Sequence, residues 1–142
     1  MRKTACLVMA VVASGVLTAA PSAEAARREN VTKTFDVTFA KQWDSKRFSQ
    51  NAGTDTFKWQ CLGVPGEPYY FEIYKYDTIV SPPRRVLDKD YKCKIKDDEG
   101  KPLIITESVQ LEYGVYTLRF SKPPGPDGIH VKGTGTYPKQ TD

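Results

Sequence analysis

Apolar and polar residues alternate with a period of two along most of this 142-residue chain. Because successive side chains of a β-strand point to opposite faces of the sheet, this period indicates strands with one buried face. Residues 31–39 and 56–61 show it most clearly, since most odd positions are apolar and the even positions hold Thr, Asp, Lys or Gln. The pattern therefore favours a fold built from β-sheet rather than from helices.

Seven strand candidates follow one another along the chain, and segments rich in Gly, Pro and Asp separate them. Short strands with such turns between them predict an all-β fold, an antiparallel Greek-key-like β-sandwich of about seven strands. Residues 40–52 lack strand character, so an α+β domain with a short helix around Trp43 is the alternative. The candidates are residues 31–39, 56–61, 69–76, 91–96, 103–106, 116–120 and 129–137.

Residues 111–120 carry the most informative local pattern of the chain. Leu111, Gly114 and Tyr116 stand in an L-x-x-G-x-Y arrangement at the start of a strand. The spacing resembles the tyrosine corner of Greek-key sandwiches, in which a Tyr turns its hydroxyl back to the upstream backbone. It is similar to many extracellular Greek-key modules and indicates no particular function. The alternative is a loop followed by an ordinary strand.

The first 25 residues have the organisation of a secretory signal peptide. Arg2 and Lys3 form a basic start, an uncharged stretch of apolar and small residues follows, and an Ala-x-Ala cleavage site ends at Ala25. A retained anchor is the alternative, but a membrane span needs about 20 predominantly apolar residues, and this stretch is shorter. We therefore expect cleavage after Ala25, secretion to the extracellular space, and a single domain at residues 26–142 with no membrane span.

The charge balance is ordinary for a soluble protein. The chain has 21 Lys and Arg against 17 Asp and Glu, a net charge of +4. Loss of Arg2, Lys3 and Glu24 with the signal peptide leaves 19 basic and 16 acidic residues, a net charge of +3. A surface that binds nucleic acid needs a stronger, clustered positive charge, so we expect no nucleic-acid partner.

Two cysteines, Cys61 and Cys93, remain after removal of the signal peptide. Thiols of exported proteins oxidise, so we expect one disulfide, Cys61–Cys93. Cys61 lies on the apolar face of its strand, which predicts that this disulfide is part of the core. Free thiols or a metal site are the alternatives, but two sulfurs without a nearby His make a poor zinc site. We expect neither a metal nor a cofactor.

His130 is the only histidine, so any catalytic triad or dyad built on imidazole must use it. It is out of phase with Ile129 and Val131, which predicts a position on the outer face of its strand. The sequence contains neither a G-x-S-x-G motif nor a Gly-rich phosphate loop. We therefore expect a protein without enzymatic activity or catalytic residues. The third hypothesis is a small secreted hydrolase that uses paired carboxylates or a Glu–Arg–His set, with these candidate residues: Glu72, Glu107, Glu112, Arg119 and His130.

The strand at 69–76 is rich in aromatic residues on both faces. The less polar face, with Tyr69, Phe71 and Ile73, is expected to point into the core. The other face then forms an exposed row suited to binding, because Tyr combines a large contact area with a polar tip. The first hypothesis is therefore a secreted, non-enzymatic module for an extracellular protein or carbohydrate. A neighbouring strand or the Trp43 segment covering this face is the alternative. The candidate binding residues are Tyr70, Glu72, Tyr74 and Tyr76.

Residues 77–90 are expected to form a loop, because two consecutive prolines, Pro82 and Pro83, cannot lie inside a sheet. Ser81, Pro82 and Pro83 stiffen it into an extended segment, which lowers the entropy lost on binding. Arg84 or Arg85 would then fit the specificity pocket of a trypsin-like protease. A secreted protease inhibitor is therefore the second hypothesis, and a solvated connection is its alternative.

Overall fold

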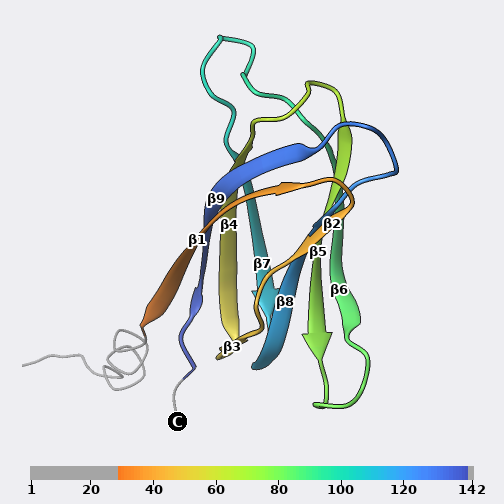
Figure 1. The fold of residues 1–142 in the computed structure, drawn as a ribbon. Coiled ribbons are helices and arrows are strands. Elements are labelled where there is room, and N and C mark those ends of the chain that lie inside the picture. The colour runs from red at the N-terminus through yellow and green to blue at the C-terminus, as the bar shows by residue number, and fades with distance from the viewer. Residues whose placement is uncertain (1–28, 141–142) are drawn as a thin grey trace, which may run out of the picture.

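The computed structural model describes residues 29–140. The expected signal peptide at residues 1–25 lies outside these residues. The described part of the chain contains nine β-strands and no helix (Figure 1). None of its residues belongs to a helix with the length and hydropathy of a membrane span. The strands are β1 (Asn30–Phe39), β2 (Gln42–Asp44), β3 (Phe48–Gln50), β4 (Gly53–Cys61), β5 (Pro68–Tyr76), β6 (Arg84–Lys92), β7 (Ile105–Leu111), β8 (Gly114–Ser121) and β9 (Ile129–Pro138).

The strands form two antiparallel sheets that join distant parts of the chain (Figure 1). In the first sheet the order is β1–β9–β4–β7, and β1 pairs with β9 along its whole length. In the second sheet the order is β2–β8–β5–β6, and β3 also pairs with β8. The fold is therefore all-β and antiparallel, as the alternation of the sequence predicts.

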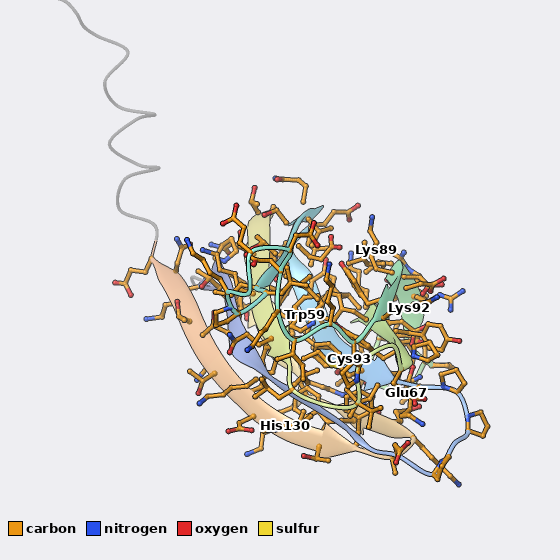
Figure 2. The ribbon with its side chains drawn as sticks, turned by 90° about the horizontal axis from the view of Figure 1, so that it is seen from above. Trp59, Glu67, Lys89, Lys92, Cys93 and His130 are labelled. Atoms are coloured by element: carbon orange, nitrogen blue, oxygen red, sulfur yellow. A yellow bond between two sulfur atoms is a disulfide. The ribbon has the colours of Figure 1, made fainter. Side chains whose placement is uncertain are left out.

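Aromatic side chains from both sheets pack together in one hydrophobic core. Trp59 of β4 lies 4.8 Å from Phe71 of β5 and 5.3 Å from Phe120 of β8, measured between ring centroids. Figure 2 shows Trp59 near the middle of the molecule. Full burial of one such side chain stabilises a fold by about 1.5–3 kcal/mol. The inner face of each sheet is the face that contributes to this core, and the outer face is the opposite one.

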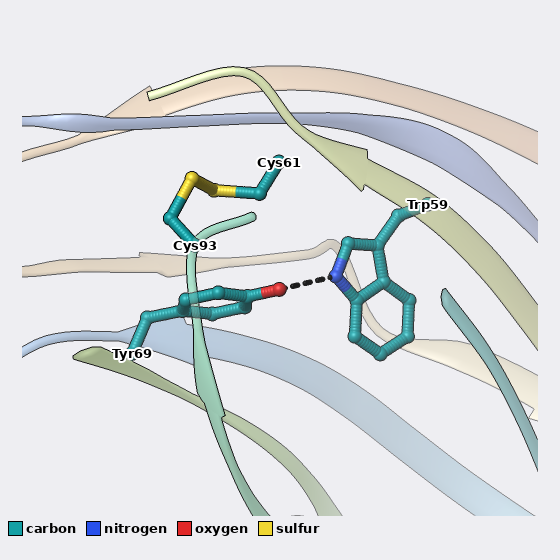
Figure 3. The surroundings of a disulfide bond; sticks show 4 residues. All are labelled: Trp59, Cys61, Tyr69 and Cys93. Atoms are coloured by element: carbon teal, nitrogen blue, oxygen red, sulfur yellow. Dashed lines mark hydrogen bonds between the residues drawn. A yellow bond between two sulfur atoms is a disulfide. The ribbon is translucent and has the colours of Figure 1, made fainter. Parts of the chain in front are cut away.

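The expected disulfide between Cys61 and Cys93 is present and buried in this core (Figure 3). The two Cα atoms are 5.4 Å apart, and the bond joins β4 of the first sheet to the segment after β6 of the second. Beside it, the Trp59 indole donates a 2.9 Å hydrogen bond to the Tyr69 hydroxyl (Figure 3). Closing a loop of this length stabilises a fold by about 3–4 kcal/mol in the chain-entropy model.

Residues 40–52 do have strand character, so the expectation that they lack it was wrong, and they form no helix. They contain β2 and β3, which both pair with β8. Trp43 packs against Phe35 and Phe120, and Phe48 packs against Tyr137. Two strands of three residues each are too short to show a period of two, which explains why the pattern missed them.

The expected loop at residues 77–90 ends earlier, because β6 begins at Arg84. Pro82 and Pro83 lie directly before the strand, where they break no pairing within the sheet. The strands expected at 91–96 and 103–106 are displaced, since β6 ends at Lys92 and β7 begins at Ile105. β6 is an edge strand, so charged residues on both of its sides hide the alternation.

The tyrosine corner that the sequence suggests is present. The Tyr116 hydroxyl donates a 2.7 Å hydrogen bond to the carbonyl oxygen of Glu112, and the Tyr116 side chain is buried. This contact fixes the turn between β7 and β8.

Threonines dominate the outer face of the first sheet. Thr32, Thr136, Thr56 and Ser108 lie in one row across its four strands. Thr106, in β7 on the same face, is exposed. Because β-branched side chains suit a pleated surface, this face needs no functional explanation.

Candidate functional site

The four candidate binding residues of β5 share the outer face of the second sheet. Their neighbours Tyr69, Phe71 and Ile73 are fully buried on the inner face, as the sequence predicts. We call the outer surface around Tyr70, Glu72, Tyr74, Tyr76 and Arg119 the tyrosine face. Its tyrosines are half-buried, whereas Glu72 is buried.

A chain of polar contacts crosses the tyrosine face from β2 to β5. The Arg119 guanidinium of β8 donates to both carboxylate oxygens of Asp44 in β2, at 2.7 and 3.3 Å. It also donates to the Tyr74 hydroxyl at 3.3 Å, and that hydroxyl donates to Glu72 Oε1 at 3.2 Å. The antiparallel register produces this order, because Arg119 lies directly opposite both Asp44 and Glu72.

The same chain continues from β5 to the edge strand β6. Arg85 donates to Glu72 Oε2 at 3.0 Å and lies 3.4 Å from the Asp88 carboxylate. The buried Glu72 carboxylate therefore has a hydroxyl on one oxygen and a guanidinium on the other. Since buried charges are costly without such partners, the contacts hold Glu72 in one position.

Local electrostatics keep the donors of this chain protonated. Burial, and then the neighbouring Glu72 carboxylate, raises the pKa of Tyr74 above its ordinary value. The hydrogen bond to Asp44 is the main cause that raises the pKa of Arg119. At neutral pH the Tyr74 hydroxyl is therefore a donor and Arg119 is a cation.

Guanidinium groups cover one side of two tyrosine rings. The Arg47 guanidinium carbon lies 3.9 Å from the centre of the Tyr76 ring, and that of Arg119 lies 4.5 Å from the centre of the Tyr74 ring. The Tyr70 side chain forms no hydrogen bond or ion pair within residues 29–140. Arginines thus cover this face in part, and Trp43 instead packs toward the core.

The partners of these tyrosines cannot be recognised from the sequence alone. There Arg119 is a candidate only for a hydrolase, and Asp44 and Arg47 stand out in no way. Asp44 and Arg119 are 75 positions apart, so only the pairing of β2 with β8 brings them together. No spacing rule within a single sequence reveals such a contact.

The residues proposed for an inhibitor loop divide between the loop and a strand. Arg84 and Arg85 begin β6 and are bound to Asp77 and Glu72, at 2.8 and 3.0 Å. Pro82 is exposed and Pro83 is half-buried. The arginines therefore lie at the base of the loop and not within it, contrary to our expectation from the sequence.

The tip of this loop carries two exposed apolar residues instead. Ile79 and Val80 have 88% and 90% of their surface exposed. Thr78 Oγ1 accepts a 2.9 Å hydrogen bond from the Ser81 backbone N–H and so closes a tight turn around them. Two aliphatic residues close to two consecutive prolines are the signal in the sequence that could have indicated this exposed pair.

The residues named for a hydrolase do not form one site. Glu72 and Arg119 belong to the second sheet, whereas His130 lies on the outer face of β9 in the first sheet, bonded to Asp36. Figure 2 shows His130 on the outside of the molecule, away from Trp59. Glu112 pairs with Lys75 at 3.2 Å, and Glu107 lies in β7 of the first sheet. Within residues 29–140, no three His, Cys, Asp or Glu side chains are placed to hold a metal ion.

Compared with protein-family models and with curated proteins, the sequence matches none of them. The functional argument therefore depends on the chemistry of the sites themselves.

Proposed function

We propose that this protein is a secreted, non-enzymatic binding module whose tyrosine face contacts an extracellular protein. The observation that carries the proposal is the chain of contacts from Asp44 through Arg119, Tyr74 and Glu72 to Arg85. Tyr and Arg are the residues most often responsible for affinity at protein interfaces. Here they are held in place before any partner arrives, which lowers the entropy lost on binding.

The stacking of the arginines favours a protein partner over a carbohydrate. Sugars bind aromatic residues by lying on an open ring face. Tyr74 and Tyr76 each have one ring face covered by a guanidinium group, so that ring face is closed to a sugar at these two positions. A protein partner instead uses the paired donors and acceptors of the face, as polar interfaces commonly do.

We also infer that the two sheets form a Greek-key β-sandwich, which makes the tyrosine face one side of a rigid body. The ring contacts of Trp59 with Phe71 and Phe120 join the two sheets and support this architecture. The tyrosine corner at Tyr116 is typical of Greek-key sandwiches and supports it as well.

A capture experiment tests the proposed function. The immobilised protein, residues 26–142, is incubated with the extracellular proteins of the producing organism, and bound proteins are identified by mass spectrometry. The captured protein is then purified and its affinity is measured for Tyr70→Ser, for Tyr70→Ser/Tyr74→Ser and for the control Thr106→Ala. We expect both tyrosine variants to bind at least about tenfold more weakly, a loss of about 1.4 kcal/mol.

Tyr70→Ser is the safer variant, because the Tyr70 side chain forms no hydrogen bond or ion pair within residues 29–140 and its loss leaves the contact chain intact. Thr106→Ala alters the outer face of the other sheet and is expected to leave the affinity unchanged. Equal binding by all variants would contradict the proposal. Retention of the wild-type protein on chitin, cellulose or xylan, with no protein captured, would replace it by carbohydrate binding.

A secreted protease inhibitor is the second candidate function. The observation that favours it is the near-complete exposure of Ile79 and Val80 at the tip of the loop between β5 and β6. In this form of the hypothesis an aliphatic side chain enters the protease pocket, and Arg84 and Arg85 stay at the base of the loop.

A further inference from the structure

A cavity of about 510 Å³ opens between β1 and the segment that holds β2 and β3. These are edge strands of the two different sheets. β2 and β3 contain three residues each and are interrupted at residues 45–47, so this edge of the second sheet is incomplete. The volume is in the range of sites that bind drug-sized ligands.

Aromatic and aliphatic side chains line most of this cavity. Phe57, Leu118 and Tyr137 are buried lining residues. Gly135 also lines the cavity, and a Cβ atom there would lie 2.8 Å from the Phe57 ring, so only glycine lets this ring lie so close to β9.

Four further lining residues are only partly buried, although they pack against the core. Their apolar surface faces water in the open cavity, which is unfavourable. An apolar ligand that covers this surface would recover that free energy. The four residues are Phe35, Val37, Trp43 and Phe48.

Positive charges gather along the same cavity. Lys33, Lys46 and Arg47 line it, and none of them has a carboxylate partner within residues 29–140. The one lining carboxylate, Asp36, is bonded to His130. The mouth therefore has an excess of positive charge that no internal group neutralises, which suits an anionic head group.

We propose that this cavity binds an anionic amphiphile, a single acyl chain that ends in a carboxylate. The chain lies against Phe35, Trp43 and Phe48, and the carboxylate lies near Lys33 and Lys46. Each methylene group that leaves water should strengthen binding by about fourfold, so affinity rises with chain length until the cavity is full. The cavity residues are separate from the tyrosine face, except that Arg47 also stacks on Tyr76.

Calorimetry with dodecanoate, below its micellar concentration, tests this site in residues 26–142. Dodecanol serves as the uncharged probe of the same chain length, and Trp emission reports contact with Trp43. We expect one molecule of dodecanoate for each protein, a blue shift of the emission, and at least about tenfold weaker binding of dodecanol, equivalent to about 1.4 kcal/mol.

Two variants probe the two ends of the site. Val37→Trp fills the apolar part, and Lys33→Glu/Lys46→Glu reverses the charge at the mouth without touching the core. Both should weaken dodecanoate binding at least about tenfold, whereas the control Lys132→Glu, on the outer face of β9, should not. The absence of saturable binding, equal affinity for dodecanol, or full affinity in Lys33→Glu/Lys46→Glu would overturn the proposal. The lysine variant keeps the test valid if Val37→Trp fails to fold.

Discussion

Asp55 and Gln50 form a polar pair inside the core, with 0% of either residue exposed. Gln50 Nε2 donates a 2.8 Å hydrogen bond to Asp55 Oδ1. Within the described part of the chain, the other oxygens, Gln50 Oε1 and Asp55 Oδ2, are buried without a partner. Both of these oxygens are acceptors when Asp55 is ionised, so the pair lacks a hydrogen-bond donor. A proton on the Asp55 carboxyl supplies this donor, since a carboxylic acid both donates and accepts hydrogen bonds. Burial raises the pKa of Asp55 to about 7, although the Gln50 hydrogen bond partly opposes the rise.

Replacement of Asp55 by Asn tests this protonated state. In the unfolded chain Asp ionises near pH 4, while native Asp55 keeps its proton up to about pH 7. Between these values the unfolded state binds fewer protons, so this group lowers the free energy of unfolding by about 1.4 kcal/mol for each unit that the pH rises. Asp55→Asn mimics the protonated acid and removes this loss.

Urea unfolding of both proteins between pH 4 and pH 8 measures the effect. The stability of Asp55→Asn relative to the wild type should increase as the pH rises toward 7 and then level off. Relative stabilities that do not change with pH would show that native Asp55 titrates like an exposed carboxyl. The difference between the two proteins cancels the titration of all other groups.

The burial of Asp55 cannot be predicted from the sequence, for a physical reason. Its side chain points inward in β4, at a position where the alternation calls for an apolar residue, so the expected strand begins one residue later. Only its pairing with Gln50, across the turn from β3, makes a carboxyl acceptable there. Tyr69 is similar, since its hydroxyl is satisfied by Trp59 and its burial raises its pKa to about 12.

At the scale of single elements, alternation identifies the strands that have one buried face and one exposed face. β1, β4, β5, β8 and β9 all agree with the expected strands to within a few residues. β6 escapes detection because it is an edge strand with exposed charges on both sides. β2 and β3 escape because three residues cannot show a period.

The β5–β6 connection yields a prediction about proteases. Arg84 and Arg85 form ion pairs at the start of β6, so either side chain would have to break an ion pair before it could enter a trypsin-like pocket. The turn around Ile79 and Val80 is tight, whereas protease clefts bind extended segments. We therefore expect no inhibition of trypsin or of an elastase by micromolar protein.

Steady-state assays with a chromogenic peptide substrate check this expectation. Stoichiometric inhibition of elastase that is lost in Ile79→Ser/Val80→Ser would instead establish the second candidate function. Inhibition of trypsin that is lost in Arg84→Ala would show that the ion pair with Asp77 opens on binding.

At the scale of the whole molecule, the two faces of the second sheet have different roles in our proposal. Its inner face completes the core with the first sheet, and its outer face carries the contact chain from Asp44 to Arg85. Fold class, the disulfide and the inward face of β5 follow from the sequence, because they depend on local alternation and on a pair of cysteines. The contact chain and the cavity do not, because they depend on strand order, which alternation leaves undetermined.

We propose, as the central claim, that the tyrosine face and no other surface contacts the partner protein. Photo-cross-linking tests it directly, with p-benzoylphenylalanine placed at position 70 in one protein and at position 106, on the outer face of the first sheet, in another. Each is irradiated in the extracellular fraction of the producing organism. We predict one discrete adduct from position 70, suppressed by excess unlabelled wild-type protein, and none from position 106. Equal adducts from both positions, or an adduct from position 106 alone, would contradict the claim.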